Sequence, residues 1–180
     1  MAGKFNIDMD DSEILMAGKF LAAFIVIFAA LSLLFSLLPL QGIELFFAAP
    51  TLEILKLFGF NGTINAGAEP VLILLQNLAV PISISYLCTG LMEVAIITAA
   101  VLSSFGISIR KRIFGVVAAI AAIALFNLFR IVASILIILW FGLDAGNFSH
   151  DLLFRIFLFA TIAGFYFVWF GWATDAKKQN

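Results

Sequence analysis

Few residues in this chain can do chemistry, and the two most reactive types occur once each. The sequence contains one cysteine, Cys88, and one histidine, His150. A cysteine thiolate is a strong nucleophile, and a histidine within reach can activate it and later protonate a leaving amine. Arg130 is the only charged residue between positions 113 and 143. An arginine in such an apolar stretch is a functional-site hypothesis by default. These residues therefore predict nucleophilic chemistry at the thiol.

Each of the three residues also has a simpler interpretation. A lone cysteine is often a small buried hydrophobe, and a lone loop histidine is usually inert. Arg130 can instead extend from a helix end to the membrane interface. The position of Cys88 favours the chemical interpretation, because it lies at the predicted start of a helix. There the helix dipole and a nearby arginine would stabilise a thiolate.

Two further residues are candidates for supporting roles. Asn127 lies three residues before Arg130 on the same helical face, where it can orient the guanidinium. Glu93 lies inside a predicted span, and buried acids in lipid tend to be paired or functional. It follows Cys88 by five residues, a poor match to one helical face, so direct contact with the thiol does not follow.

Arg155 is the third supporting candidate. It follows His150 by five residues, and it can extend outward, pair with Asp151, or join the site. One cysteine and one histidine fall short of a zinc ligand set. A metal site is therefore not expected unless carboxylates complete the ligand set.

The composition identifies the class of protein that must position these residues. The chain has 180 residues, of which 64% are hydrophobic and 12% are charged, and the mean hydropathy is +1.17. These values exclude an ordinary soluble domain and a disordered chain. A single cysteine excludes a disulfide scaffold, and a net charge of -1 offers no basic surface for nucleic acid. We expect an all-α integral membrane protein with four to six transmembrane helices, each about 20 residues long.

The apolar runs divide this single polytopic domain, residues 1–180, into segments. Phe20 to Leu38 carries no charge and is followed by Pro39. Positions 113–143 are too long for one crossing, so they form either one protruding helix or two pieces broken near Asn127 to Arg130. The predicted segments are a cytoplasmic segment over 1–19, a first span over 20–40, an extracytoplasmic cap over 41–87, a catalytic helical core over 88–172 and a cytoplasmic tail over 173–180. Within the catalytic core, we expect spans at about 88–105 and 152–172 and a polar loop over 144–151.

The cap region has two kinds of pattern. Ile43 to Phe60 combines apolar and charged residues and suits an amphipathic helix lying in the interface. Ile82 and Ile84 alternate with serines, which is the period of a half-buried strand. Val71 to Leu75 is a candidate partner for a short β-hairpin. Because that run is continuously apolar, it can instead enter the membrane.

The basic residues predict the orientation. With four spans and a cytoplasmic N-terminus, Lys56 alone faces outward and seven basic residues face inward: Lys4, Lys19, Arg110, Lys111, Arg112, Lys177 and Lys178. This bias follows the positive-inside rule and places both termini in the cytoplasm. If helical, Cys88 lies ~33 Å before Arg110 and Arg130 lies ~27 Å beyond Arg112. Cys88, Arg130 and His150 therefore converge near the outer face of a multi-pass protein of the plasma membrane.

The order of the motifs resembles a known family. Cys88-Thr89-Gly90-Leu91 opens a span, Asn127-Leu128-Phe129-Arg130-Ile131 lies in the next apolar segment, and His150 precedes the last span. This order resembles the archaeosortase/exosortase family of membrane transpeptidases over roughly residues 70–165. The resemblance implies that Cys88 is the nucleophile, Arg130 stabilises the thiolate or oxyanion, and His150 is the general acid and base. Arg155 competes with His150 for the third position.

The resemblance also implies a substrate and a reaction. A transpeptidase of this kind cleaves secreted proteins at a C-terminal sorting tail made of a short motif, a hydrophobic helix and a basic end. It then transfers the protein through a thioester to an acceptor, for which a membrane lipid is the leading candidate, and it needs no cofactor. Two other interpretations stay open. One is a small transport subunit with Arg130 and Glu93 lining a polar path, and the other is a structural or assembly protein.

Overall fold

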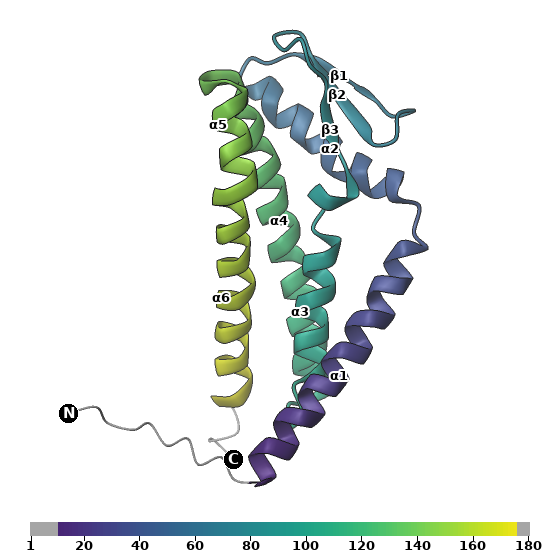
Figure 1. The fold of residues 1–180 in the computed structure, drawn as a ribbon, viewed down its shortest axis with the longest axis vertical. Coiled ribbons are helices and arrows are strands. Elements are labelled where there is room, and N and C mark those ends of the chain that lie inside the picture. The colour runs from purple at the N-terminus through teal and green to yellow at the C-terminus, as the bar shows by residue number, and fades with distance from the viewer. Residues whose placement is uncertain (1–10, 176–180) are drawn as a thin grey trace, which may run out of the picture.

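The long helices lie lengthwise and set the shape of the molecule (Figure 1). The structure, a computed structural model, describes residues 11–175. Three of its helices are long and apolar enough to cross a membrane: α1 (Asp11–Ser36), α4 (Ile109–Phe141) and α6 (Phe154–Asp175). A shorter apolar helix, α3 (Leu91–Ser103), has 13 residues and is ~20 Å long, which is less than the ~30 Å thickness of a hydrocarbon core. The mostly helical membrane class agrees with the prediction, whereas a count of four to six spans is not confirmed.

Helix α1 begins earlier than predicted. It starts at Asp11 rather than near residue 20 and ends at Ser36, before Pro39. Asp11 and Glu13 lie in its first turn, where negative charge stabilises the helix dipole, so the polar residues extend the helix instead of preceding it. None of its residues is buried, and it packs on α3 at the edge of the molecule. The remainder of the predicted terminal segments, residues 1–10 and 176–180, lies outside the described residues.

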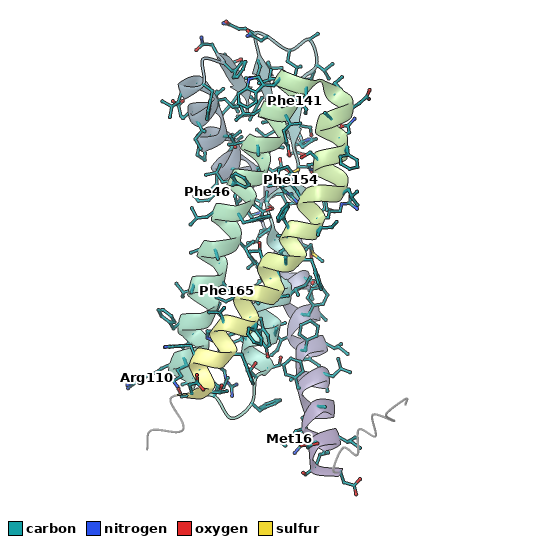
Figure 2. All side chains as sticks on the ribbon, turned by 90° about the vertical axis from the view of Figure 1, so that its left-hand side faces the viewer. Met16, Phe46, Arg110, Phe141, Phe154 and Phe165 are labelled. Atoms are coloured by element: carbon teal, nitrogen blue, oxygen red, sulfur yellow. The ribbon has the colours of Figure 1, made fainter. Side chains whose placement is uncertain are left out.

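Helix α4 is continuous over 33 residues, ~50 Å. The break considered near Asn127 to Arg130 does not occur, because no proline or glycine interrupts positions 116–141. The helix ends at Gly142, whose φ of +89° is readily adopted only by glycine. One unbroken helix therefore connects the end of the molecule near Arg110 to the end near Phe141 (Figure 2).

The cap consists of a helix and a small sheet at one end of the long helices (Figure 1). Figure 2 shows that Phe141 lies at this end. Helix α2 spans Leu40–Leu57, and the antiparallel strands β1 (Gly62–Asn65), β2 (Val71–Leu75) and β3 (Ile82–Ile84) follow in the order β1-β2-β3. Val71 pairs with Ile84, as expected of the candidate hairpin, and β1 adds a strand that the sequence did not predict. Val71 to Leu75 forms the central strand of this sheet and not part of a membrane-spanning helix.

Two apolar cores lie toward opposite ends of α4. The first joins the cap to the second half of α4, and Val71, Ile73 and Leu55 are fully buried in it. The second joins α3, the first half of α4 and α6, with Ile97 and Trp169 at its centre. The first core fixes the sheet, and therefore the turn that follows β3, against α4.

The predicted polar loop over 144–151 is helical instead. A short helix, α5 (Leu143–Phe148), is followed by a π-helical turn, η2 (Ser149–Leu153), that leads directly into α6. π-turns of this kind are frequent at functional sites. His150 therefore sits on a helical turn whose backbone is fixed at both ends.

Candidate active site

Cys88 lies in a tight turn rather than at the start of a long helix. It ends a 3-10 turn, η1 (Tyr86–Cys88), between β3 and α3. Its backbone N–H donates to the carbonyl of Ser85 at 2.8 Å, and the Thr89 hydroxyl donates to the carbonyl of Tyr86 at 2.6 Å. The prediction that the dipole of the following helix acts directly on this thiol was wrong, because α3 begins at Leu91, beyond Gly90. The turn nevertheless holds the cysteine in a defined position.

Gly90 allows this turn to sit directly on α4. Its φ of +78° is left-handed, and a Cβ atom there would lie 2.0 Å from Nδ2 of Asn127. The Asn127 side chain is fully buried and donates to the carbonyl of Ile123 at 3.0 Å, while its Oδ1 has no partner among the described residues. Asn127 thus packs under the turn that holds Cys88, and no hydrogen bond joins it to Arg130.

Arg130 is buried beside the same turn. Its side chain is 5% exposed, so the guanidinium lies within the protein and does not reach the surface. Nη2 donates a long hydrogen bond of 3.5 Å to the carbonyl of Leu87, and Nε has no partner within residues 11–175. A buried guanidinium with an unused donor is an uncommon arrangement, because burying an unpaired polar group costs free energy.

His150 completes the group around the thiol. It forms a side-chain hydrogen bond with Cys88, and both residues line a cavity of about 190 Å³. Apolar side chains form most of its wall, contributed by β3 and by one face of α4, and α5 contributes Gly146 and Asn147. The lining residues are Ile82, Ser83, Ile84, Cys88, Ile131, Ser134, Ile135, Ile138, Gly146, Asn147 and His150.

These neighbours change the acidity of the thiol. Burial raises the pKa of Cys88, but hydrogen bonds with the His150 side chain and with the side chain and backbone of Ser85 lower it, and the positive charge of Arg130 lowers it further. The net pKa lies below the ordinary value of a cysteine. The Ser85 hydroxyl is 3.7 Å from the Cys88 sulfur. More of the thiol is therefore ionised near neutral pH than in an ordinary cysteine.

The remaining predicted residues lie apart from the cavity. Glu93 is partly exposed in the first turn of α3, where its charge favours the helix N-terminus, and it does not line the Cys88 cavity. Arg155 is exposed on α6 and is also absent from the cavity wall. Within residues 11–175, no group of three or more His, Cys, Asp or Glu side chains gathers in a way that would hold a metal ion.

Sequence reasoning did not identify two serines that the structure places at this site. Ser85 precedes Cys88 by three residues, a spacing that puts it beside the sulfur once the segment forms a 3-10 turn. Ser134 follows Arg130 by four residues, so helical periodicity alone places both on one face of α4. The position of Ser85 depends on a 3-10 turn that the sequence did not reveal. The position of Ser134 could have been predicted from its spacing of four residues from Arg130.

The arrangement can perform acyl chemistry. A thiol with a lowered pKa and an imidazole that forms a hydrogen bond with it line one small cavity. The buried guanidinium of Arg130 is not part of the cavity wall, but its charge acts on the same thiol. Such a group supplies a nucleophile, a proton carrier and a fixed positive charge. Comparisons with protein-family models, with curated proteins and with solved structures gave no match to this chain.

Proposed function

We propose that the protein is a membrane-embedded cysteine transpeptidase acting on the C-terminal sorting tail of secreted proteins. The observation behind this proposal is the hydrogen bond between His150 and the Cys88 thiol beside buried Arg130. The order of the Cys88, Arg130 and His150 motifs, which resembles the archaeosortase/exosortase family, supports the same activity. The resemblance suggests the substrate class, and the geometry supports the type of chemistry.

The reaction begins at the thiol. Cys88 gives its proton to His150, and the thiolate attacks the scissile carbonyl carbon to form a tetrahedral intermediate. Arg130 stabilises the thiolate and the developing oxyanion; a preorganised donor of this kind contributes about 3 kcal/mol. When the C–N bond breaks, the departing amine takes the proton from His150, and a thioester remains on Cys88.

A second nucleophile then releases the acyl group. The hydroxyl or amine of an acceptor attacks the thioester, gives its proton to His150, and Cys88 leaves as a thiolate that recovers that proton. A lipid head group is the proposed acceptor, since the reaction would take place beside the membrane surface. With water as the acceptor, the same site would act as a protease.

The proposed orientation follows from the ends of the molecule. Arg110 and Met16 lie at one end and Phe141 at the other (Figure 2). Lys19, Arg110, Lys111 and Arg112 belong to the first end, which we assign to the cytoplasm by the positive-inside rule. The cap and the Cys88 cavity then face outward. A substrate tail would insert beside the helices with its basic end near the cytoplasm and its motif at Cys88.

A non-enzymatic membrane subunit is the second candidate, in the form of either a transport path or an assembly partner. A polar path between Arg130 and Glu93 would support transport, but neither residue lines the Cys88 cavity. The group of Cys88, His150 and Ser85 would have no role in such a path. The thiol chemistry is therefore the better supported of the two.

The decisive experiment follows processing of tail-bearing secreted proteins in cells that contain wild-type protein or Cys88→Ala at equal membrane abundance. We expect full-length precursor to accumulate with Cys88→Ala and mature, membrane-attached product to form with the wild type. The mass of the mature product would identify the acceptor.

A matched pair of variants makes the result specific. Cys88→Ser keeps the size of the side chain but should rescue poorly, because a serine hydroxyl is far less acidic than a thiol. Thr161→Ala removes an exposed hydroxyl that bonds to its own helix, and it should process normally. Normal processing by Cys88→Ala would rule out the nucleophile and favour the non-enzymatic role.

A further inference from the structure

Ser134 has a hydroxyl that the fold does not use. It lies on α4 one turn beyond Arg130, is 6% exposed, and lines the Cys88 cavity. Its Oγ is buried and has no hydrogen-bond partner among the residues that the structure describes. A buried hydroxyl without a partner costs free energy, so its presence in the cavity wall calls for an explanation.

Several other helical hydroxyls donate to their own helix, whereas the hydroxyls of Ser32, Thr51 and Thr98 are, like that of Ser134, buried without a partner among the described residues. Of these four, only Ser134 lines the Cys88 cavity. Ser103 donates to the carbonyl of Ala99 at 2.6 Å, and Ser104 donates to the carbonyl of Ala100 at 2.8 Å. Thr161 and Thr174 form the same bond with the residue four positions earlier. A helical serine normally has this bond within reach. The Ser134 hydroxyl does not make it, so its donor is unused among the described residues, in a residue that belongs to the cavity wall.

A second unused donor lies on the same face. The Nε of Arg130 is also buried without a partner, and residues four apart on a helix are neighbours with a rise of ~6 Å. Ser134 lines the cavity together with Cys88, and Arg130 does not line it but lies close enough for its charge to act on the same thiol. Ser149 also has a buried hydroxyl without a partner, but it is not part of the cavity wall.

We infer that Ser134 binds the carbonyl oxygen of the scissile peptide bond and, with Arg130, forms the oxyanion hole of the site. This inference rests on the proposed transpeptidase function. As the Sγ–C bond forms, the carbonyl π electrons move onto the oxygen, and the Ser134 hydroxyl donates to the resulting negative charge. When the electrons return, the C–N bond breaks and the amine leaves with the proton from His150. Ser134 gives up no proton in the cycle.

The test compares Ser134→Ala with wild type in substrate processing, in thermal unfolding and in the rate at which iodoacetamide alkylates Cys88. Loss of one oxyanion donor lowers kcat by about 100-fold with KM nearly unchanged. Thermal stability should stay the same or rise, because the substitution removes a buried group without a partner. Alkylation should be unchanged, since the hydroxyl acts on the substrate and not on the thiol.

Two variants serve as controls. Ser134→Thr keeps the hydroxyl and should keep most of the activity. Ser103→Ala makes the same truncation at a buried helical serine away from the cavity, and it should process substrate at the wild-type rate.

The outcomes separate this inference from the function on which it rests. Wild-type kcat in Ser134→Ala, with Cys88→Ala inactive, would overturn the role of Ser134 and leave the transpeptidase intact. A changed alkylation rate in Ser134→Ala would assign the hydroxyl to the thiol and also overturn the inference. Normal processing by Cys88→Ala would reject the function and the inference together.

Discussion

At the scale of single residues, the site depends on how the neighbours of Cys88 counteract the effect of burial on the pKa of its thiol. Burial alone raises the pKa of the thiol, and the hydrogen bond with His150 is the largest influence in the opposite direction. Ser85 and Arg130 act in the same sense as His150. His150 and Arg155 were alternatives for the third catalytic position. The geometry favours His150, because Arg155 is exposed and does not line the cavity.

The assignments of His150 and of Arg155 to the third position predict different pH profiles for alkylation of Cys88. The alkylation rate of wild-type Cys88 should rise with pH around a midpoint below that of a free thiol, about 8.5, because thiolate is the reactive form. His150→Gln should move the midpoint to higher pH, because the hydrogen bond from His150 no longer offsets the rise in the thiol pKa caused by burial. The same substitution should slow processing by about 10²- to 10⁴-fold. Arg155→Gln is the matched control and should leave both unchanged. The opposite pattern would assign the third position to Arg155.

At the scale of elements, the site depends on the contact between the turn after β3 and the middle of α4. The first apolar core fixes the sheet on α4, and the sheet delivers the turn that ends at Cys88. Gly90 and Asn127 then bring the two segments together, because a side chain larger than hydrogen does not fit between them. α5 and η2 bring His150 into the wall of the same cavity.

Gly90→Ala should therefore destabilise the protein for two reasons. A positive φ costs a residue with a Cβ about 1–2 kcal/mol, and the new Cβ would also collide with Asn127, which is fully buried and has little room to move. Gly142→Ala shares the positive φ of +89° but meets nothing within 4 Å. In thermal unfolding in detergent, Gly90→Ala should lower Tm more than Gly142→Ala and should also slow processing. Equal decreases in Tm would show that the Asn127 contact yields at little cost.

At the scale of the whole molecule, the apolar outer surface matches a membrane. Large hydrophobic side chains on the long helices face outward, with Phe167 80% and Phe159 74% exposed on α6. The α4 residues of the Cys88 cavity lie between Ile131 and Ile138, in the second half of that helix, and the basic cluster at Arg110 to Arg112 lies at its start. A bundle built this way separates the reactive site from the basic end by most of the length of α4.

The proposed orientation predicts which ends are accessible from outside the cell. In a Cys88→Ala background, Thr63→Cys in the cap should react with a membrane-impermeant maleimide on intact cells. Ser108→Cys, next to the basic cluster, should react only after the membrane is opened. Both positions are exposed in the structure, so accessibility of the side chain does not differ between them. Labelling of Ser108→Cys alone on intact cells would reverse the orientation.

The sequence by itself determined what depends on composition and periodicity. Apolar runs predicted the long helices, alternation of Ile82 and Ile84 with serines predicted a strand, and residue types singled out Cys88, Arg130 and His150. These signals are local, because helix and strand periods are set by the backbone of each segment. Only the tertiary structure decided that η1 separates Cys88 from α3 and that α5 and η2 replace a loop. It also decided that Ser85 lies beside the sulfur and that the Ser134 hydroxyl stays unpaired, because such contacts depend on how distant segments pack against one another.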